Sequence, residues 1–291
     1  MMKKILLILA ILFSTLSYSQ LTDANFQTAI NTCLTTNPVD GLCSNSEYGA
    51  MPDWDVSSVT DMSYAFDEKS TFDGDISGWD VSSVTDMQAM FLGATAFNQD
   101  ISTWDISSVV DIGYMFTVAE SFNQDISGWN VSNVTSMYRV FFGATSFNQP
   151  IGDWDVSNVV SMDGMFKNAS SFNQPIGNWD MSNVTRTDNM FKRTTFNQDI
   201  GNWDVSNVID MSQMFSGSLF SREIRNWDVS KVKTMRSMFQ DSSFNQPIGD
   251  WDVSQVQDMG YLFFNSFFNQ PIGKWQVSKV KDMSFMFSKS L

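Results

Sequence analysis

The sequence of 291 residues contains no histidine, and this absence limits the chemistry that the chain can perform. Histidine is the side chain most used in general acid–base catalysis and the commonest protein ligand of metal ions. The sequence also has no glycine-rich phosphate loop, no nucleophile elbow and no Cys/His pair. Its carboxylates recur at a fixed period, so none of them stands out as an acid–base pair. We therefore expect that the protein is not an enzyme.

Basic residues are few, since 17 Lys and Arg stand against 32 Asp and Glu and give a net charge of −15. This excess of negative charge disfavours nucleic acid and anionic membrane surfaces as partners. The shortage of basic residues is uneven along the chain. Residues 20–150 hold 2 basic and 17 acidic residues, whereas residues 151–291 hold 13 and 15. The difference fits either drift on a solvated surface or a polarised rod with distinct ends for distinct partners.

A continuous apolar run occurs only near the N-terminus. Two lysines, the apolar run over residues 5–13, and the small residues Ser17 and Ser19 before Gln20 predict a secretory signal peptide over residues 1–19. The run is too short to span a bilayer, and no later stretch could do so. We expect a protein that is secreted or held at the outer cell surface, without membrane insertion.

Cysteine occurs twice, and Cys33 and Cys43 both lie in residues 20–53, ahead of the repeats. Two nearby cysteines in an exported protein are expected to form a disulfide, with free thiols or half of a metal site as the alternatives. Asp23 is placed to N-cap a helix that runs to about Leu34. The segment is predicted to be a small helical N-terminal cap, with a separate binding module as the alternative.

What the chain has in abundance is one repeated unit, which occupies residues 54–291 and begins at each of ten tryptophans. Neighbouring tryptophans are 25 residues apart five times and then 24 apart four times. A fixed period of this length is typical of a solenoid, in which stacked units bury one continuous core. The last of the ten repeats is incomplete. The tryptophans are Trp54, Trp79, Trp104, Trp129, Trp154, Trp179, Trp203, Trp227, Trp251 and Trp275.

Each unit is predicted to contain a short strand, a turn, a short helix and a second turn. In the third repeat Trp104 and Ile106 alternate with a polar residue, as in a strand, and the strands of successive units are expected to form one parallel sheet. The apolar residues from Val109 to Phe116 are three and four apart, which suits about two turns of helix. The invariant serine, Ser107 in this repeat, is well placed as the N-cap of that helix.

Equivalent residues of successive units form columns, and the tryptophan, methionine and phenylalanine columns are expected to lie in the core. A buried indole N–H needs an acceptor, which a carbonyl of the neighbouring unit could supply. The asparagine of the Phe-Asn-Gln motif recurs in most units. It predicts a ladder of side chains bonded to the backbone of adjacent units, with breaks at Asp73 and Ser221.

The residue after each tryptophan is expected to point out of the sheet, and it is acidic in most units. Like charges stacked at the strand spacing repel each other and need compensation. Either each carboxylate accepts hydrogen bonds from backbone or serine donors, or the column forms an acidic strip that binds a basic protein or cations such as Ca²⁺. No other cofactor is expected. The candidate strip consists of Asp80, Asp105, Asp155, Asp180, Asp204, Asp228 and Asp252.

The motif Phe-Asn-Gln-(Asp/Pro)-Ile-(Ser/Gly)-x-Trp-Asp-Val-Ser-(Asn/Ser)-Val-(Thr/Val)-x-Met-x-x-Met-Phe resembles the repeat of the BspA-like leucine-rich-repeat surface proteins. The resemblance covers residues 54–291. It implies a secreted or surface-attached bacterial protein with a leucine-rich-repeat-like solenoid. In some members of that family it implies adhesion to host matrix proteins or to other cells.

These features favour a secreted or cell-surface module that binds a protein or a glycan of another cell or of a matrix. The alternative is a structural spacer, or a truncated fragment of a longer repeat surface protein, without a ligand of its own. The tenth unit has no further unit to cover it in this sequence. We expect fraying or self-association at this uncapped end, because an uncovered parallel edge invites pairing.

Overall fold

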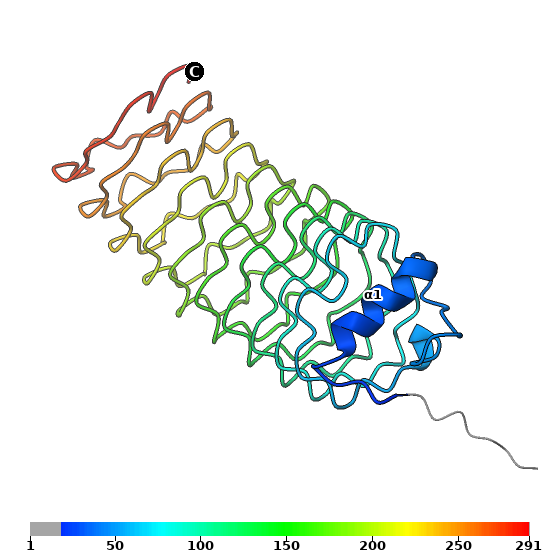
Figure 1. Ribbon diagram of the computed structural model, residues 1–291. Helices are drawn as coiled ribbons and strands as arrows, with labels where there is room; N and C mark the ends of the chain where they lie inside the picture. The colour runs from blue at the N-terminus through cyan, green and yellow to red at the C-terminus, as the bar shows by residue number, and fades with distance from the viewer. Residues whose placement is uncertain (1–18, 291) are drawn as a thin grey trace, which may run out of the picture.

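The computed structural model describes residues 19–290, so nearly all of the predicted signal peptide lies outside the described residues. The chain winds into ten coils, one for each tryptophan unit, which are stacked along one axis (Figure 1). Over residues 19–290 the helices are the α-helix α1, Phe26–Thr36, and the short 3-10 helix η1, Met51–Asp53, and no extended strand is formed. Neither helix is long and apolar enough to cross a membrane.

Successive coils are joined by parallel bridges between residues at one fixed position of the unit, seven after the tryptophan. The series starts with Asp61 and Asp86 and ends with Asp258 and Asp282, and it contains nine bridges. Every coil therefore keeps the same register with the next one. The change of the period from 25 to 24 residues does not disturb this register, because the bridges continue through it.

Beyond each bridge the backbone alternates between two kinds of hydrogen bond. The N–H of Met62 donates to the carbonyl of Asp86 in the second coil at 2.9 Å, whereas the N–H of Ala65 donates to Met62 within its own coil at 3.2 Å. The same alternation recurs in later coils, and it is accompanied by a positive φ ten residues after the tryptophan, 58° at Tyr64. The segment is a chain of tight turns in which every second N–H reaches the next coil.

This arrangement corrects the predicted secondary structure of the unit. The predicted strand at Trp104 and Ile106 makes no bridge, and the predicted helix from Val109 to Phe116 is not formed. The spacing of three and four arises because the turns close over three residues, as where the N–H of Met115 donates to the carbonyl of Ile112 at 3.0 Å. The residue between them, Tyr114, has φ of 60°, which a continuous right-handed helix excludes.

Two columns of phenylalanine rings fill the interior of the stack. The rings of Phe166 and Phe172 lie face to face with centroids 3.8 Å apart. Phe166 also stacks on Phe141 at 5.7 Å and on Phe191 at 5.8 Å, in the coils on either side. Full burial of such a side chain stabilises the fold by about 1.5–3 kcal/mol relative to exposure. Most of this burial is supplied by neighbouring coils, so a single coil could not form its core alone.

The prediction that each indole N–H finds a carbonyl in the neighbouring unit is confirmed from Trp79 onward, whereas Trp54 donates to the carbonyl of Gly49 in the N-terminal segment. Trp154 Nε1 donates to the carbonyl of Ile126, one coil earlier, at 3.1 Å. The same bond recurs from Trp104, at 3.2 Å, to Trp275, at 3.1 Å. The bond satisfies a polar group that would otherwise be buried without a partner, and it ties each coil to the one before it.

The asparagine ladder is also present, and it begins one unit earlier than predicted. The backbone N–H of Asn148 donates to Oδ1 of Asn123 at 2.9 Å, and equivalent bonds join the neighbouring coils. Asp73 was predicted to break the ladder, but its carboxylate accepts from the N–H of Asn98 at 2.9 Å and so starts it. A carboxylate oxygen replaces the amide oxygen there because both accept the same N–H.

The N-terminal segment covers the first coil, with α1 lying across it (Figure 1). Phe26 packs edge-on against Trp79 at 5.8 Å, and a disulfide joins Cys33 and Cys43, whose Cα atoms are 5.3 Å apart. The predicted role of Asp23 as a helix N-cap is wrong. The N-cap of α1 is Asn25, and no side chain caps the helix.

The coil that starts at Trp275 leaves several apolar side chains in contact with solvent. Met283 is 41% exposed, Phe285 57% and Phe287 48%, although the residues equivalent to Met283 and Phe287 are buried in the inner coils. Trp275 itself is 8% exposed, because it packs against the coil before it. The end of the stack is therefore the most apolar part of the described surface that a partner could cover.

Candidate binding surface

The structure places the seven residues of the predicted acidic strip in one exposed column. Each carboxylate accepts from the serine two residues later through Oδ1. At Asp155, the N–H of Ser157 donates at 3.1 Å and its hydroxyl at 2.7 Å. Backbone bonds of the same kind follow Asp80, Asp105, Asp180, Asp204, Asp228 and Asp252.

These hydrogen bonds favour the charged form of the strip residues Asp80, Asp105, Asp155, Asp180, Asp228 and Asp252. The bonds from Ser157 lower the pKa of Asp155 below its ordinary value, against a small opposing effect of burial and of Asp180. The serine bonds lower the pKa of Asp80 and Asp252 in the same way. The strip therefore carries a row of ionised carboxylates at neutral pH, each with one oxygen engaged in a turn.

The prediction that the invariant serine caps a helix is wrong, because the donors of Ser157 go backwards to Asp155. Asparagine accepts the same two hydrogen bonds in the fourth unit, where the N–H and the hydroxyl of Ser132 donate to Oδ1 of Asn130 at 3.1 and 2.7 Å. This turn does not require a negative charge. Across residues 19–290 there is also no group of three or more acidic or cysteine side chains arranged to hold a metal ion.

The positions nine, ten and thirteen residues after the tryptophan differ from the rest of the unit, because their residues change from coil to coil, and they range from buried to exposed. They lie on the side of the stack that carries the chain of turns, and we call this side the variable face. The residues at position nine of the ten units are, in order, Ser63, Gln88, Gly113, Tyr138, Asp163, Asp188, Ser212, Arg236, Gly260 and Ser284.

Aromatic and cationic side chains meet on the variable face of the third, fourth and fifth coils. The guanidinium of Arg139 lies 4.9 Å from the ring centroid of Tyr138, 5.9 Å from Tyr114 and 5.6 Å from Phe142. The ammonium of Lys167 lies 5.1 Å from the same Phe142 ring. Tyrosine and arginine are the residues that most often dominate binding at protein surfaces, so this group is the best candidate contact site.

Next to this group lies a cluster of acids around one arginine. Asp163 and Asp188 occupy the same position in adjacent coils and are each 7% exposed. The guanidinium of Arg186 is 3.0 Å from Asp188 and 3.7 Å from Asp210. Oδ1 of Asp163 is buried and has no hydrogen-bond partner within the described part of the chain.

The acid cluster favours binding of a proton. Burial, together with the charges of Asp163 and Asp210, raises the pKa of Asp188 to about 6, although Arg186 opposes the shift. Burial likewise raises the pKa of Asp163. Two carboxyl groups at this spacing are more stable when they share a proton than when both are charged. A shared proton also gives the buried oxygen of Asp163 a donor.

A second aromatic and cationic group lies further along the variable face. The guanidinium of Arg236 is 5.2 Å from the ring of Tyr261, and it pairs with Asp282 at 2.8 Å and Asp258 at 3.4 Å. Tyr261 in turn stacks on Phe285 at 5.0 Å. Here the cation is neutralised by two carboxylates, so the group has less charge to offer a ligand.

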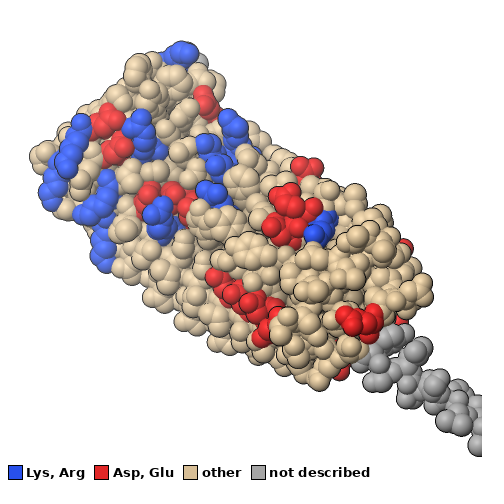
Figure 2. Space-filling model, in the orientation of Figure 1, with Lys and Arg blue, Asp and Glu red and all other residues tan. Residues whose placement is uncertain are grey.

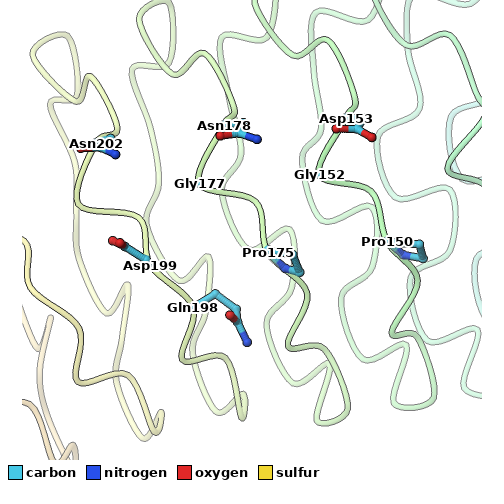
Figure 3. Close-up of a pocket in the computed structure, with 9 residues that line it drawn as sticks. All are labelled: Pro150, Gly152, Asp153, Pro175, Gly177, Asn178, Gln198, Asp199 and Asn202. Atoms are coloured by element: carbon cyan, nitrogen blue, oxygen red, sulfur yellow. The ribbon is translucent and has the colours of Figure 1, made fainter.

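A groove of about 400 Å³ crosses three coils at the turns that precede the tryptophans. In Figure 3, Asp153, Asn178 and Asn202 form one row above Gly152 and Gly177. A Cβ on Gly152 would come within 2.3 Å of the carbonyl of Pro175 in the next coil. The glycines are thus needed for the coils to approach each other. The groove follows from this packing, and no group in it is set apart as a binding residue.

Charge is distributed unevenly over the surface. On the face shown in Figure 2, Asp and Glu form rows toward the N-terminal end, whereas Lys and Arg gather toward the C-terminal end. The difference follows the composition, since Lys69 and Arg139 are the only basic residues between positions 20 and 150. A partner would therefore meet a strongly negative field over residues 20–150 and a nearly neutral one over residues 151–291.

Arg139, Tyr138 and Asp188 were not among the residues predicted from the sequence. That prediction followed the columns that recur, and these residues lie in columns that vary. The variation itself was the available signal, because positions that change within an otherwise uniform repeat are not fixed by the core packing that all units share.

Ten copies of one unit, stacked in constant register, define a repeat protein whose core runs between its coils. The family model described as "Mycoplasma protein of unknown function, DUF285" matches residues 41–141, 125–221 and 192–291, and the chain belongs to this family. No curated protein and no solved structure matches the chain.

Proposed function

We propose that the protein is a secreted or cell-surface bacterial module, without catalytic activity, that binds a protein or a glycan of another cell or of a matrix. The proposal includes export by the signal peptide over residues 1–19. It also includes assignment of the stack to the leucine-rich-repeat-like solenoids of the BspA type. Membership of a repeat family supports the class of protein, and the resemblance of the repeated motif supports the finer assignment.

The single observation that carries this proposal is the contrast between the core columns and the variable face. Core positions such as Trp154 are the same in every unit, whereas position nine changes between aromatic, acidic, basic and small residues. The changes bring Tyr138, Arg139 and Phe142 together at one place on the variable face. Stacking alone does not require this grouping, so it favours recognition over a purely structural role.

The test is a pull-down of matrix proteins and of whole cells by the mature protein and by a Tyr138→Ala/Arg139→Ala variant. We expect saturable binding by the mature protein and at least a severalfold loss in the variant. A Tyr261→Ala variant, altered at the neutralised second group, is the matched control. Absence of saturable binding by the unaltered protein would favour the structural spacer instead.

We also propose that the apolar end of the stack supports self-association. Phe285 and Phe287 are about half exposed there, and exposed apolar side chains of this size are stabilised by a covering surface. This association is separate from the binding of a ligand by the variable face, because Tyr138 and Arg139 belong to the fourth coil and lie far from the end in sequence.

A further inference from the structure

Four basic side chains of the fourth, fifth and sixth coils gather beside the aromatic group of the variable face. We call Arg139, Lys167, Lys192 and Arg193 the cationic cluster. Arg139 and Lys167 share the ring of Phe142, at 5.6 and 5.1 Å. Lys167 and Lys192 occupy equivalent positions in adjacent coils, so their backbones are about 4.8 Å apart. The cluster spans three coils of the stack.

The cationic cluster has few counter-ions although the protein as a whole is strongly acidic: Asp163 lies close enough to affect Arg139 and Lys167 electrostatically, but it forms an ion pair with neither. None of the ion pairs formed within residues 19–290 involves any of its four members. Lys192 donates to the amide oxygen of Gln213, which is neutral. The nearby arginine Arg186, by contrast, pairs with both Asp188 and Asp210. Acidic residues outnumber basic ones in the sequence, yet in the part that the structure describes none of these four cations forms an ion pair.

The cations also repel each other. Partial burial, followed by the charge of Arg139, lowers the pKa of Lys167 below its ordinary value. Burial and the charges of Lys167 and Arg193 lower the pKa of Lys192. Groups that destabilise one another in this way are stabilised when an anion is placed between them.

We propose that the cationic cluster binds the carboxylate groups of an acidic polysaccharide, with the sugar rings lying along Tyr138 and Phe142. This inference rests on the proposed function and narrows its ligand to a uronate-bearing glycan. Lys167 and Lys192 supply the charge opposite the carboxylate, and Arg139 adds a planar donor that matches its two oxygens. The partly exposed aromatic rings offer faces against which the C–H groups of a sugar pack.

The acidic side chains around the cationic cluster favour a polysaccharide over an acidic peptide as its ligand. Asp163, Asp188 and Asp210 lie close enough to affect one another's pKa. A peptide rich in Asp and Glu brings a carboxylate at nearly every residue, so these acids repel it. A polysaccharide separates its carboxylates by hydroxyl groups, and a hydroxyl donates to a carboxylate. Mixed cationic and acidic patches therefore suit an acidic sugar polymer better than an acidic peptide.

The test measures binding of the full mature chain to hyaluronate oligosaccharides, in which uronate alternates with a neutral sugar. Binding is measured by calorimetry at low and at high salt. We expect saturable binding that weakens with salt, because the contacts are charged. A Lys167→Gln/Lys192→Gln variant should bind about tenfold or more weakly, since each lost charge-assisted bond is worth about 1.4 kcal/mol or more.

The matched control is Lys279→Gln/Lys281→Gln, which removes the same charge from exposed lysines outside the cluster. It should bind hyaluronate as the unaltered protein does, and thermal melts establish that both variants fold. Equal loss in both variants would show a nonspecific charge effect and overturn the inference. Equal or tighter binding of polyglutamate would also overturn it, in favour of an acidic peptide.

The same variants distinguish this inference from the proposed function on which it rests. Binding to cells or matrix proteins without binding to hyaluronate would overturn the glycan inference and leave the proposed function standing. Loss of cell binding in the Lys167→Gln/Lys192→Gln variant, together with loss of hyaluronate binding, would support both. Absence of every kind of binding by the unaltered chain would overturn both.

Discussion

The carboxylate of Asp23 accepts the backbone N–H of Thr60 at 2.7 Å and takes the place of a missing coil. In the second coil the equivalent N–H, that of Thr85, donates to the carbonyl of Thr60 at 2.8 Å. Asp23 also accepts from the N–H of Asp61 at 3.1 Å. One side chain therefore closes the backbone of the first coil, and the cap imitates the unit that would precede it.

An Asp23→Ala substitution should loosen the first coil. It leaves two backbone N–H groups of Thr60 and Asp61 without their acceptor, which costs about 1–3 kcal/mol. Amide hydrogen exchange at these two residues should become faster, while exchange in the middle coils stays unchanged. Asp53→Ala is the control, because this exposed carboxylate accepts no hydrogen bond within the described residues. Unchanged exchange at Thr60 in Asp23→Ala would contradict the assigned role.

Substitution of one phenylalanine column at two places should give very different costs. Phe166→Ala removes a ring that is fully buried between Phe141 and Phe191 and should destabilise the fold by about 3–5 kcal/mol. Phe287→Ala changes the same column where the ring is 48% exposed, so its cost should be well under half as large. Urea unfolding followed by tryptophan fluorescence measures both, and equal costs would show that the end coil is covered in solution.

The acid cluster should make stability fall as pH rises. The pKa of Asp188 is about 6 in the folded protein and near 3.8 in the unfolded chain. The folded state therefore holds more protons between these values, so this group's stabilisation is complete below about pH 4 and is lost by about pH 6–7. The Asp188→Asn variant has no carboxyl group at this position and does not lose this stabilisation. As pH rises from about 4 to about 7, we therefore expect its free energy of unfolding to increase by about 1–2 kcal/mol relative to that of the unaltered protein.

The exposed strip supplies the control for this pH dependence. The pKa of Asp180 is lowered by the bonds from Ser182, so its stabilisation is present above about pH 4 and is lost as pH falls further. The difference in the free energy of unfolding between Asp180→Asn and the unaltered protein should therefore vary with pH only below about pH 4. A difference between Asp188→Asn and the unaltered protein that stays constant from pH 4 to pH 7 would contradict the raised pKa.

The acidic strip can be tested for its two interpretations separately. Asp155→Asn should leave stability nearly unchanged, because Asn130 makes the same bonds to its serine. Asp155→Ala removes both bonds from Ser157 and should cost about 0.5–1 kcal/mol. Thermal melts with and without EDTA complete the series. Loss of partner capture in the asparagine variant, at unchanged stability, would identify the strip as a binding surface.

Self-association through the end of the stack should depend on concentration. Light scattering of the mature protein is expected to show a mass that rises above that of a monomer. A Phe285→Ser/Phe287→Ser variant should remain monomeric, because it removes two of the exposed apolar side chains. A monomer at every concentration in the unaltered protein would contradict the proposal.

The core and the hydrogen bonds between successive coils could be predicted from the sequence because they repeat. A tryptophan that recurs at a fixed period must meet the same surroundings in each coil, and the bond from Trp154 to the carbonyl of Ile126 follows from that symmetry. The bond from Asn148 to Asn123 follows in the same way. In both cases the repeated side chain finds the same hydrogen-bond partner in the adjacent unit, so the pattern of one unit is enough to predict the bond.

The path of the backbone within a unit could not be predicted in this way. The spacing from Val109 to Phe116 suits a helix and also suits a row of three-residue turns. Tyr114 has φ of 60° without being glycine, and nothing in its side chain indicates a left-handed conformation. Its neighbours impose this conformation, since every second N–H must reach the next coil.

The candidate contact site was missed for a related reason. The distances from Arg139 to Tyr138 and Phe142 depend on which positions of adjacent coils face the same side. The sequence prediction followed the recurring columns, and positions nine, ten and thirteen vary from unit to unit. The register of the bridges, from Ser136 to Ser161 and on to Arg186, is what brings these residues together.

The constant register has a consequence for how such a chain can change its length. Because each coil presents the same donors on one side and the same acceptors on the other, a coil can be duplicated or deleted without creating a mismatched junction. The surface residues of that coil are gained or lost with it. Recombination between repeats can therefore rearrange the recognition surface while the interior stays the same.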